Sequence, residues 1–447
     1  MSVEQSIIKF GFGRKDVTPD PSVRLGGYGI EIRPAKIIND RLNATSIFIN
    51  KGKKKIILIS LDWLGIEEED VDAIQEAINT ETGISKQNII ITAIHSHTAP
   101  NTIGMPGWGN KETKYIEKII PEIVASAVEA SKNLRPVKIG VGSIYSETGV
   151  NRREVRKDGT ISFDGDPGGS FDPEMTVISF KDKNGIAGMI VHYGAHATAF
   201  GTAAVVSRDW PGIMTDRIEK QIKAPVMFIN GSIGDTGPRT SSFQKNGLFS
   251  AGVGDGIDSI REVGYRAAAD ALNAFVKIKK YSDDIILNII TEEVLFPYAP
   301  LHDSEKAKRE IIKLEPDKNK YGTPMYMYNH WNAVIREHEK PEQERAKGKN
   351  YLQSILRLGD IVLIPFPGEL FSEIALRIRK LSPFQYTLCS SLANDYIGYI
   401  PTREARHRGG YEVWCADHFV YGYGLAENID DIIVKDVLER LGRLKIN

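Results

Sequence analysis

The sequence predicts one large α/β domain in which a mixed sheet, or several sheets, is covered by helices. Short apolar runs rich in β-branched residues alternate with segments of helical periodicity along the 447-residue chain. No linker or shift in composition divides the chain, and no internal repeat is visible. A polar, helix-prone stretch at about 297–350 is typical of an inserted cap or lid, so we expect residues 1–447 to form a single domain carrying this insertion.

The composition excludes several classes of protein. Charged residues make up 26% and hydrophobic residues 41%, and the formal net charge is -1, so neither disorder nor a nucleic-acid partner is indicated. Two cysteines, Cys389 and Cys415, are too few for a disulfide framework or a thiolate zinc site. The N-terminus lacks a signal peptide and no apolar run reaches membrane-spanning length. We therefore predict a cytoplasmic protein that binds a small molecule, with its oligomeric state left open.

The first elements follow βαβ order. The run KKIILISLDWLG at 54–65 predicts a strand that ends at a carboxylate, and VDAIQEAINTETG at 71–83 predicts a helix closed by glycine. The apolar run NIIITAI at 88–94 then predicts a buried strand of a largely parallel sheet.

Later segments continue the alternation. A helix is expected at 115–134, broken or kinked near Pro121. We expect further strands at VKIGVGSIYS, MTVISF, GMIVHYGAHA, APVMFING, IILNIITEEVLF and SILRLGDIVLIPFPG. The last run leads through a Pro-Gly turn into an amphipathic helix, with Glu369 expected at its start.

Two histidines follow the strand at 88–94, in the stretch ITAIHSHTAP. If extended geometry persists, His95 and His97 project from the same face at the strand's end, where Pro100 makes continuation unlikely. Ligand sites in open α/β sheets gather outside the carboxyl ends of the strands. The pair either shares a metal or an anionic substrate there, or is one satisfied buried histidine beside one solvated histidine.

Other strand ends carry polar residues of the same kind. His192 and His196 follow one strand, Asp235 lies in a Gly-rich loop able to bind an oxyanion, and Asp209 and Glu369 follow separate apolar runs. Each alone has a structural explanation, such as a carboxylate satisfying a helix N-terminus. Together, two or three histidines and a carboxylate form the ligand set of a catalytic zinc site with one position open for water.

The chain resembles the catalytic domain of the neutral (non-lysosomal) ceramidases, zinc-dependent amidases that cleave an N-acyl bond. The resemblance rests on ordered blocks: GFGRKDVTPDPSVRLGGYG, LISLDWLG, AIHSHTAP, GVNRR, FDPEMTVISF, VHYGAHAT, NGSIGDTGPR, PFPGELF and YIGYIPTREARHRGGYE. It implies the large mixed-sheet fold of that family.

The resemblance also implies roles for individual residues. The zinc ligands would be His95, His196, Glu369 and Tyr399, the last as a phenolate. His97 would lie close to the metal or the developing oxyanion, Arg152 and Tyr411 would contact the reacting carbonyl, and Asp235 would support its loop. Neutral imidazoles and a carboxylate leave zinc positively charged, which lowers the pKa of a bound water to about 7. The reaction expected is amide hydrolysis by zinc-activated water.

One departure from the family affects the mechanism. Where the ceramidases have a functional serine in Gly-Asp-Val-Ser-Pro, this chain has Gly237, with Thr236 adjacent and Ser232 five positions earlier. A mechanism in which zinc-activated water attacks the substrate does not require this serine. The chain also leaves little room for the family's C-terminal β-sandwich and lacks a secretion signal, so we expect a small, fairly polar N-acyl substrate.

Other functions remain open at this stage. An amidohydrolase barrel would carry His-x-His on its first strand, and a metallophosphoesterase would need a better Gly-Asn-His-Glu motif than Asn329-His330-Trp331. A carbohydrate-active enzyme on the same scaffold is an alternative because four tryptophans flank the site loops: Trp108, Trp210, Trp331 and Trp414. A true ceramide hydrolase and a non-catalytic ligand-binding protein are the others.

Overall fold

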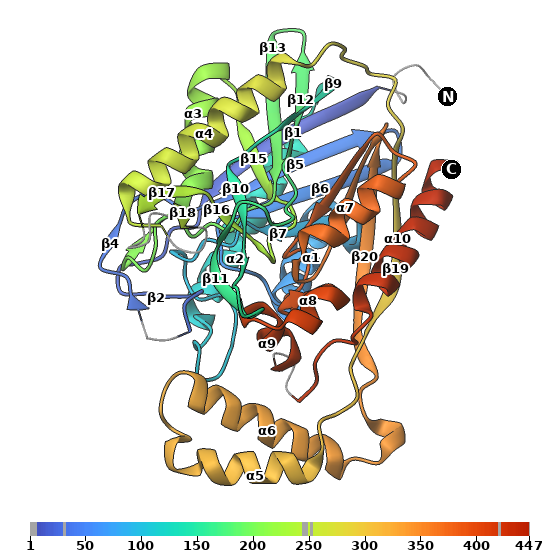
Figure 1. Ribbon diagram of the computed structural model, residues 1–447. Coiled ribbons are helices and arrows are strands. Elements are labelled where there is room, and N and C mark those ends of the chain that lie inside the picture. Colours follow the sequence, from blue (N-terminus) through green and yellow to red (C-terminus); the bar gives the residue numbers. More distant parts are fainter. Residues whose placement is uncertain (1–6, 30–32, 244–248, 251–253, 419–421, 447) are drawn as a thin grey trace.

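The computed structural model describes residues 7–29, 33–243, 249–250, 254–418 and 422–446 and confirms the mixed α/β class (Figure 1). Three sheets of four or five strands form the body. In order across each sheet, the first has β7 (Ile89–Ala93), β6 (Lys54–Leu61), β5 (Asn43–Lys51), β1 (Ile8–Asp16) and β8 (Arg135–Pro136). The second has β15 (Val226–Asn230), β13 (Gly185–Tyr193), β12 (Glu174–Asp182) and β9 (Lys138–Tyr145). The third has β19 (Leu287–Pro297), β20 (Gly348–Leu358), β21 (Ile361–Pro365) and β23 (Tyr386–Ser390).

One topology occurs three times in this body, although no repeat is visible in the sequence. In each sheet, three strands pair antiparallel, and a helix then leads to a fourth strand that is parallel to the third. The crossover helices are α1 (Glu68–Thr82), α3 (Asp209–Ile222) and α7 (Ser372–Leu381). The parallel pairs β6/β7, β13/β15 and β21/β23 are the expected product of such crossovers. Within these three sheets, the predicted parallel pairing therefore holds only at these pairs.

A long helix follows the last strand of each repeat. These helices are α2 (Thr113–Lys132), α4 (Ile257–Val276) and α10 (Ile429–Ile446). They pack against β1, β9 and β19, the first strands of their own repeats. In the first two repeats glycines admit the helix: a Cβ at Gly13 would lie 2.0 Å from Ser126 O, and one at Gly142 would lie 2.2 Å from Ala274 O. Side chains at these glycines would push the helices off their sheets.

Helix α2 differs from expectation at Pro121. The helix runs unbroken from Thr113 to Lys132 with the proline inside it, so the predicted break is wrong. The buried residues of α2 face α1 and the first sheet, and this tertiary packing outweighs the loss of one backbone hydrogen bond.

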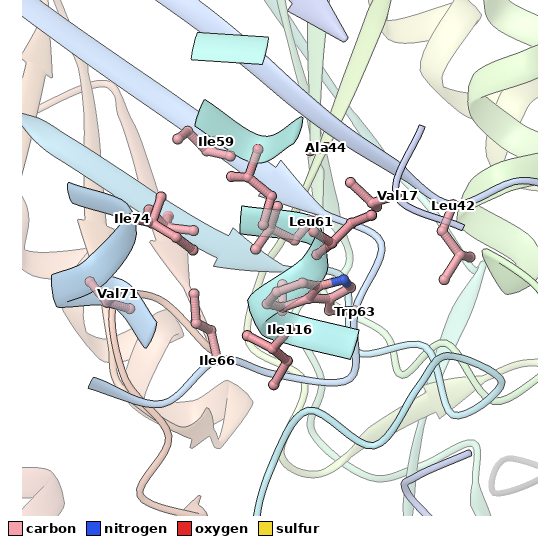
Figure 2. Close-up of a cluster of buried hydrophobic side chains, with 14 of the residues drawn as sticks. Val17, Leu42, Ala44, Ile59, Leu61, Trp63, Ile66, Val71, Ile74 and Ile116 are labelled. Atoms are coloured by element: carbon pink, nitrogen blue, oxygen red, sulfur yellow. The ribbon is translucent and has the colours of Figure 1, made fainter. Parts of the chain in front are cut away.

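The inner faces of the three sheets share one apolar core, to which Leu58, Ile190 and Leu363 each contribute from a different sheet. A second cluster fills the space between the first sheet and helices α1 and α2. Figure 2 shows Trp63 in this cluster, with Leu61, Ile66 and Ile116 around it. The indole Nε1 of Trp63 donates to the Tyr115 hydroxyl at 2.9 Å, which fixes the chain just beyond β6. That segment borders the candidate site.

Smaller elements complete the fold. Strands β10 (Gly149–Val155), β11 (Ile161–Asp166) and β16 (Thr236–Pro238) form a three-stranded sheet. Four two-stranded pairs are β2 (Arg24–Leu25) with β3 (Arg33–Pro34), β4 (Ile37–Ile38) with β14 (Val205–Val206), β17 (Thr240–Phe243) with β18 (Phe249–Ser250), and β22 (Glu369–Leu370) with β24 (Tyr399–Ile400). Two short helices near the site are α8 (Arg403–Arg408) and α9 (Tyr411–His418).

The polar stretch expected as an insertion lies between β19 and β20. It contains α5 (Ser304–Leu314) and α6 (Thr323–Glu339), which pack as a pair. Figure 1 shows this pair at one end of the molecule, apart from the three sheets. Within the described ranges, every helix is too short or too polar to cross a bilayer.

Candidate functional site

The candidate site lies where the three repeats meet, beyond the carboxyl ends of their parallel strands. His95 and His97 follow β7, His196 follows β13, and Glu369 follows β21. Backbone hydrogen bonds join these loops to one another or to neighbouring strand ends: His97 N–H donates to Ala197 O at 3.1 Å, Ala93 N–H to Leu392 O beyond β23 at 3.1 Å, and Gly234 N–H beyond β15 to Leu370 O at 2.9 Å. The loops that carry the side chains are thus fixed to one another.

Three imidazoles and one carboxylate converge at this junction. The Nε2 atoms of His95 and His97 are 3.1 Å apart. A carboxylate oxygen of Glu369 lies 3.0 Å from His196 Nε2, and its other oxygen lies 3.6 Å from His95 Nε2. All four residues are buried, His97 being the most exposed at 8%. The structure therefore brings together four of the side chains that the resemblance assigned to one site.

The route by which the two paired histidines meet differs from the prediction. Strand β7 ends at Ala93, and His95 has a φ of 64°, in the left-handed region that non-glycine residues rarely occupy. The rings share a direction because the backbone turns sharply, and not because the strand continues. Strain of this kind is concentrated at functional sites, where surrounding structure holds it in place.

Hydrogen bonds set the tautomers of two of these histidines. His95 Nδ1 lies 2.6 Å from Leu64 O, and His196 Nδ1 lies 3.1 Å from Thr236 O. Because a carbonyl oxygen only accepts, both Nδ1 atoms carry the hydrogen and both Nε2 atoms present a lone pair. His196 Nε2 and Glu369 Oε2 have no hydrogen-bond partner despite their 3.0 Å separation. Buried acceptors that face one another fit a bound cation, and second-sphere carbonyls of this kind orient metal-binding histidines.

The electrostatics of the site also favour the ionisation states that suit a bound cation. Burial lowers the pKa of His95 and His97 and, with the charge of Arg152, brings the pKa of His196 to about 3. Burial alone would raise the pKa of Glu369, but His95, His196 and Arg152 together lower it to about 2. At neutral pH the site holds neutral imidazoles and an ionised carboxylate, the protonation states that metal ligation requires.

Glu369 is held by a strand and not by a helix, contrary to the prediction. It lies in β22, where its register partner in parallel β24 is Tyr399, and its N–H donates to Gly398 O at 2.8 Å. Helix α7 begins three residues later at Ser372. The N–H and hydroxyl of Ser372 both donate to Asp235 Oδ1, at 2.9 and 2.7 Å. Asp235 thus joins its Gly-rich loop to the start of α7.

Two tyrosines adjoin the carboxylate, and only one was predicted. The hydroxyl oxygen of Tyr399 accepts a hydrogen bond from Arg152 at 2.9 Å, and burial raises the pKa of that phenol well above its usual value. Tyr396, three residues earlier in the same motif, donates to Glu369 Oε1 at 2.9 Å. Sequence reasoning missed Tyr396 because YIGYIPT contains two equivalent tyrosines. Metal ligation by Tyr399 stays a prediction.

Arg152 forms the charged wall of the site. Its buried guanidinium donates to Glu412 Oε1 at 3.0 Å, to Gly234 O at 3.0 Å and to Tyr399. Glu412 also accepts from Arg153 at 2.6 Å. The sequence did not indicate Glu412, although it follows Tyr411 directly in the GGYE block. This carboxylate fixes Arg152 and offsets its charge.

Tyr411 lies at the rim of the site. The residue is 43% exposed, and its ring centroid lies 6.1 Å from that of Tyr399. Trp108 lies beyond it, with ring centroids 6.4 Å apart. Tyr411 is thus near enough to the charged wall to meet a substrate that enters from the surface.

The ring of His97 rests against a glycine-rich segment. A Cβ at Gly27 would lie 2.4 Å from the His97 ring, and the Tyr28 ring packs edge-on against it at 4.9 Å. Arg33 donates to His97 O at 2.8 Å. These contacts were also missed from the sequence, although LGGYG is part of the first block of the family resemblance and its glycines mark a close approach.

Comparison with known proteins shows to which family a chain with this site belongs. Residues 8–272 match the family model described as neutral/alkaline non-lysosomal ceramidase, N-terminal. The chain belongs to this family. Membership implies a hydrolase that acts on amide bonds.

Solved ceramidase structures share the fold of this family member. A structure described as ceramidase complexed with C2 superposes with a TM-score of 0.75 at 17% identity, covering 98% of this chain and 75% of that chain. The neutral ceramidase from Pseudomonas aeruginosa has a TM-score of 0.71 at 18% identity, with the same coverage. No curated protein matches the chain.

Several polar residues singled out in the sequence lie beside the ceramidase-like centre and not within it. His192 Nε2 is 2.9 Å from Cys389 O, which accounts for it as a structural residue. Asp209 accepts from the backbone N–H groups of Ala199 and Phe200 at 3.0 and 2.8 Å. It therefore holds the loop after His196 instead of facing the cluster.

The position of the family's serine contains no replacement hydroxyl. Gly237 lies in β16, and the neighbouring Thr236 hydroxyl lies 2.8 Å from the Ser372 hydroxyl. Thr236 is thus engaged with the start of α7. The carbonyl of the same residue accepts the hydrogen bond of His196, so the segment orients a histidine.

The four tryptophans do not form a common surface. Trp210 and Trp331 are buried, at 0% and 4% exposure, so stacking on a sugar is excluded for them as placed. Trp108 and Trp414 lie with Tyr326 in an aromatic cluster beside Tyr411, with Trp108 stacked on Tyr326 at 4.6 Å. This cluster borders the rim.

Proposed function

We propose that this chain is a zinc-dependent hydrolase that cleaves the amide bond of a small, fairly polar N-acyl compound. The observation that carries the proposal is the convergence of His95, His97, His196 and Glu369 from three repeats, with buried lone pairs that lack partners. Nitrogen and carboxylate ligands of this number are typical of catalytic zinc.

His95, His196 and Glu369 would hold the metal with water in the open position, and Tyr399, which the resemblance implied as a further ligand, would act beside it through its phenol hydroxyl. The fixed tautomers support this assignment for His95 and His196. When bound, zinc polarises a carbonyl group and makes water a nucleophile near neutral pH. The hydrogen bond from Tyr396 to Glu369 would hold the carboxylate in its ligating orientation.

Arg152 and Tyr399 would stabilise the charge that develops on the carbonyl oxygen. Because Arg152 donates to the phenol oxygen, it makes the Tyr399 O–H a stronger donor, and Tyr399 is thereby suited to donate to the amide carbonyl. Glu412 and Gly234 keep the guanidinium in place, so little reorganisation is needed as the charge grows.

His97 is suited to move the proton. Burial and the neighbouring histidines and arginines keep its imidazole neutral, and its Nδ1 is buried without a partner. A neutral imidazole can take the proton of the attacking water and pass it to the departing amine. Tyr411 at the rim would position the amide, and Asp235 would keep the Gly-rich loop in register with α7.

The preference for a polar substrate is supported by the buried charges around the reacting position. Arg152, Glu369 and Glu412 are each at most 2% exposed and lie in one wall. A polar N-acyl compound can form hydrogen bonds with the charged groups of this wall, whereas an aliphatic chain placed against it cannot. Ceramide is the competing substrate, because the aromatic cluster at the rim could contact a lipid.

An activity screen of the zinc-loaded protein tests the proposal. The panel contains short N-acyl amides, N-acyl amino sugars, lactones and long-chain ceramide, with His95→Ala as the control. We expect turnover of short N-acyl amides that His95→Ala abolishes. Turnover of ceramide alone would disprove the polar-substrate part, and equal activity in His95→Ala would disprove the metal mechanism.

A further inference from the structure

A second histidine cluster lies outside the candidate active site. His302, His330 and His418 each offer a ring nitrogen within 4.8 Å of the other two. They come from three separate places: the loop before α5, the middle of α6 and the end of α9. The insertion between β19 and β20 therefore meets the helix that carries Tyr411 and Glu412 through three imidazoles.

His330 is the least satisfied member of this cluster. It is 3% exposed, and neither of its ring nitrogens makes a hydrogen bond of good geometry within the described chain, although the backbone of His418 lies near enough to act on the ring. A neutral imidazole has one donor and one acceptor, and leaving both unpaired in the interior is costly. A cation bound by the acceptor nitrogen would remove part of that cost.

The other two rings are held by backbone groups. His418 Nδ1 lies 2.7 Å from Trp414 O, so this nitrogen carries the hydrogen and Nε2 presents a lone pair. The backbone of Asp417 lies close enough to the His302 ring to favour its protonated form. The same arrangement, a carbonyl behind an imidazole, orients His95 and His196 in the candidate active site.

Space for an ion is present beside the cluster. A cavity of about 20 Å³ is lined by His330, His418, Tyr326, Asn329 and residues 104–106. This volume holds one water-sized particle. The nitrogen-bearing side chains of this lining are the imidazoles of His330 and His418 and the amide of Asn329, which suit a transition-metal ion better than calcium or magnesium.

We propose that His302, His330 and His418 bind a second divalent metal ion of the zinc type, which fastens the α5–α6 insertion to α9. Its role is structural: α9 begins with Tyr411 and Glu412, and the ion ties the far end of that helix to α6. Solvent can complete the coordination, because His302 and His418 are only partly buried.

The charges near the cluster provide a way to alter its affinity. Lys306, whose ammonium lies over the Trp331 ring at 5.3 Å, acts on all three histidines as a positive charge. Asp417 acts on His302 and His418 as a negative charge. Removing the lysine charge should strengthen binding of a dication to these rings.

Metal stoichiometry of the full chain tests the proposal. The protein is stripped with a chelator, reloaded with Zn²⁺, separated from free metal and measured by elemental analysis. We expect His330→Gln to hold one ion fewer than the wild type, and the exposed control His407→Gln to hold the same number as the wild type. His95→Ala should still retain the ion of the second cluster, which separates this test from the fate of the active site.

Further measurements keep the test decisive if His330→Gln fails to fold. His302→Gln changes a partly exposed ring, and it should lower Zn²⁺ affinity at this site about 100-fold and remove one Co²⁺ absorption signal. Lys306→Gln should raise the affinity several-fold. Equal metal content in the wild type and both histidine variants, with identical Co²⁺ spectra, would overturn the proposal.

Discussion

The two histidine clusters differ in what surrounds them. His95, His97 and His196 lie at the junction of three sheets, with Glu369 between the rings and Arg152 in the adjoining wall. His302, His330 and His418 join an inserted helix pair to α9, and the charges that act on them are Lys306 and Asp417.

This difference separates a site suited to chemistry from one suited to holding elements together. In the first cluster a buried carboxylate and a buried guanidinium face the same space, so a bound substrate meets both a hydrogen-bond acceptor and a directed hydrogen-bond donor. The second cluster has imidazoles and aromatic rings, which can hold an ion, and the cation that acts on them, Lys306, lies over the Trp331 ring. Substitutions in the two clusters should therefore have different consequences.

The largest effect is expected from removing one histidine of the first cluster. His196→Ala should lose the active-site metal and lower kcat/KM for amide hydrolysis about 1000-fold or more, because both ligation and carbonyl activation are lost. The matched change His330→Gln should keep kcat/KM within about threefold, since its ring lies outside the reacting centre. Metal analysis and steady-state kinetics of both variants check this. A similar loss of activity in both would remove the distinction between the clusters.

Next in size is the change Arg152→Lys in the charged wall. Lysine keeps the charge but cannot contact Glu412, Gly234 O and Tyr399 together, so we expect kcat to fall about 100-fold with the metal retained. The control Arg153→Lys changes a neighbouring arginine that binds the same Glu412. It should reduce stability while leaving kcat within a few-fold. An unchanged kcat in Arg152→Lys would contradict the proposed role of the guanidinium.

A smaller effect is expected at the glycine behind His97. Gly27 and Gly159 have φ values of 89° and 84°, so alanine at either costs about 1 kcal/mol of backbone strain. Only at Gly27 would the new Cβ meet the His97 ring, whereas nothing lies within 4 Å at Gly159. We expect Gly27→Ala to lower kcat/KM about tenfold and Gly159→Ala to leave it unchanged. Equal kinetics would show that the position of His97 is not important.

The smallest effect on activity is expected at His192, a buried histidine that belongs to neither cluster, where the change is in stability. Burial lowers its pKa to about 4 in the folded protein, from about 6.5 when unfolded. The unfolded chain therefore binds more protons between these values, and stability is lost as the pH falls from 6.5 toward 4. His192→Gln should remove about 2 kcal/mol of the difference in free energy of unfolding between pH 7 and pH 5. Urea unfolding of both proteins at the two pH values measures this, and identical pH dependence would refute it.

Local sequence patterns determined most of the individual elements. The buried runs at 54–61 and 89–93 and the helix closed by Gly83 follow from periodicity and from the left-handed φ of 66° that glycine allows. The resemblance of ordered blocks identified the family, and it predicted that His95, His196 and Glu369 belong to one metal site. These features can be predicted from the sequence because each depends on residues that are close together in the chain, or on motifs that follow one another in a fixed order.

The tertiary structure decided what depends on distant partners. Glu369 became part of a strand because Gly398 O accepts its N–H, and Pro121 stays inside a helix because it lies on the exposed face of α2 while the opposite face is packed against α1 and the first sheet. Tyr396 contacts the carboxylate of Glu369, and Glu412 contacts the guanidinium of Arg152. The partners are far apart in the sequence, so helical or strand periodicity does not reveal these contacts. The threefold topology and the cluster of His302, His330 and His418 are likewise invisible in the sequence. Periodicity records which face of an element is buried, but only packing determines which buried faces meet.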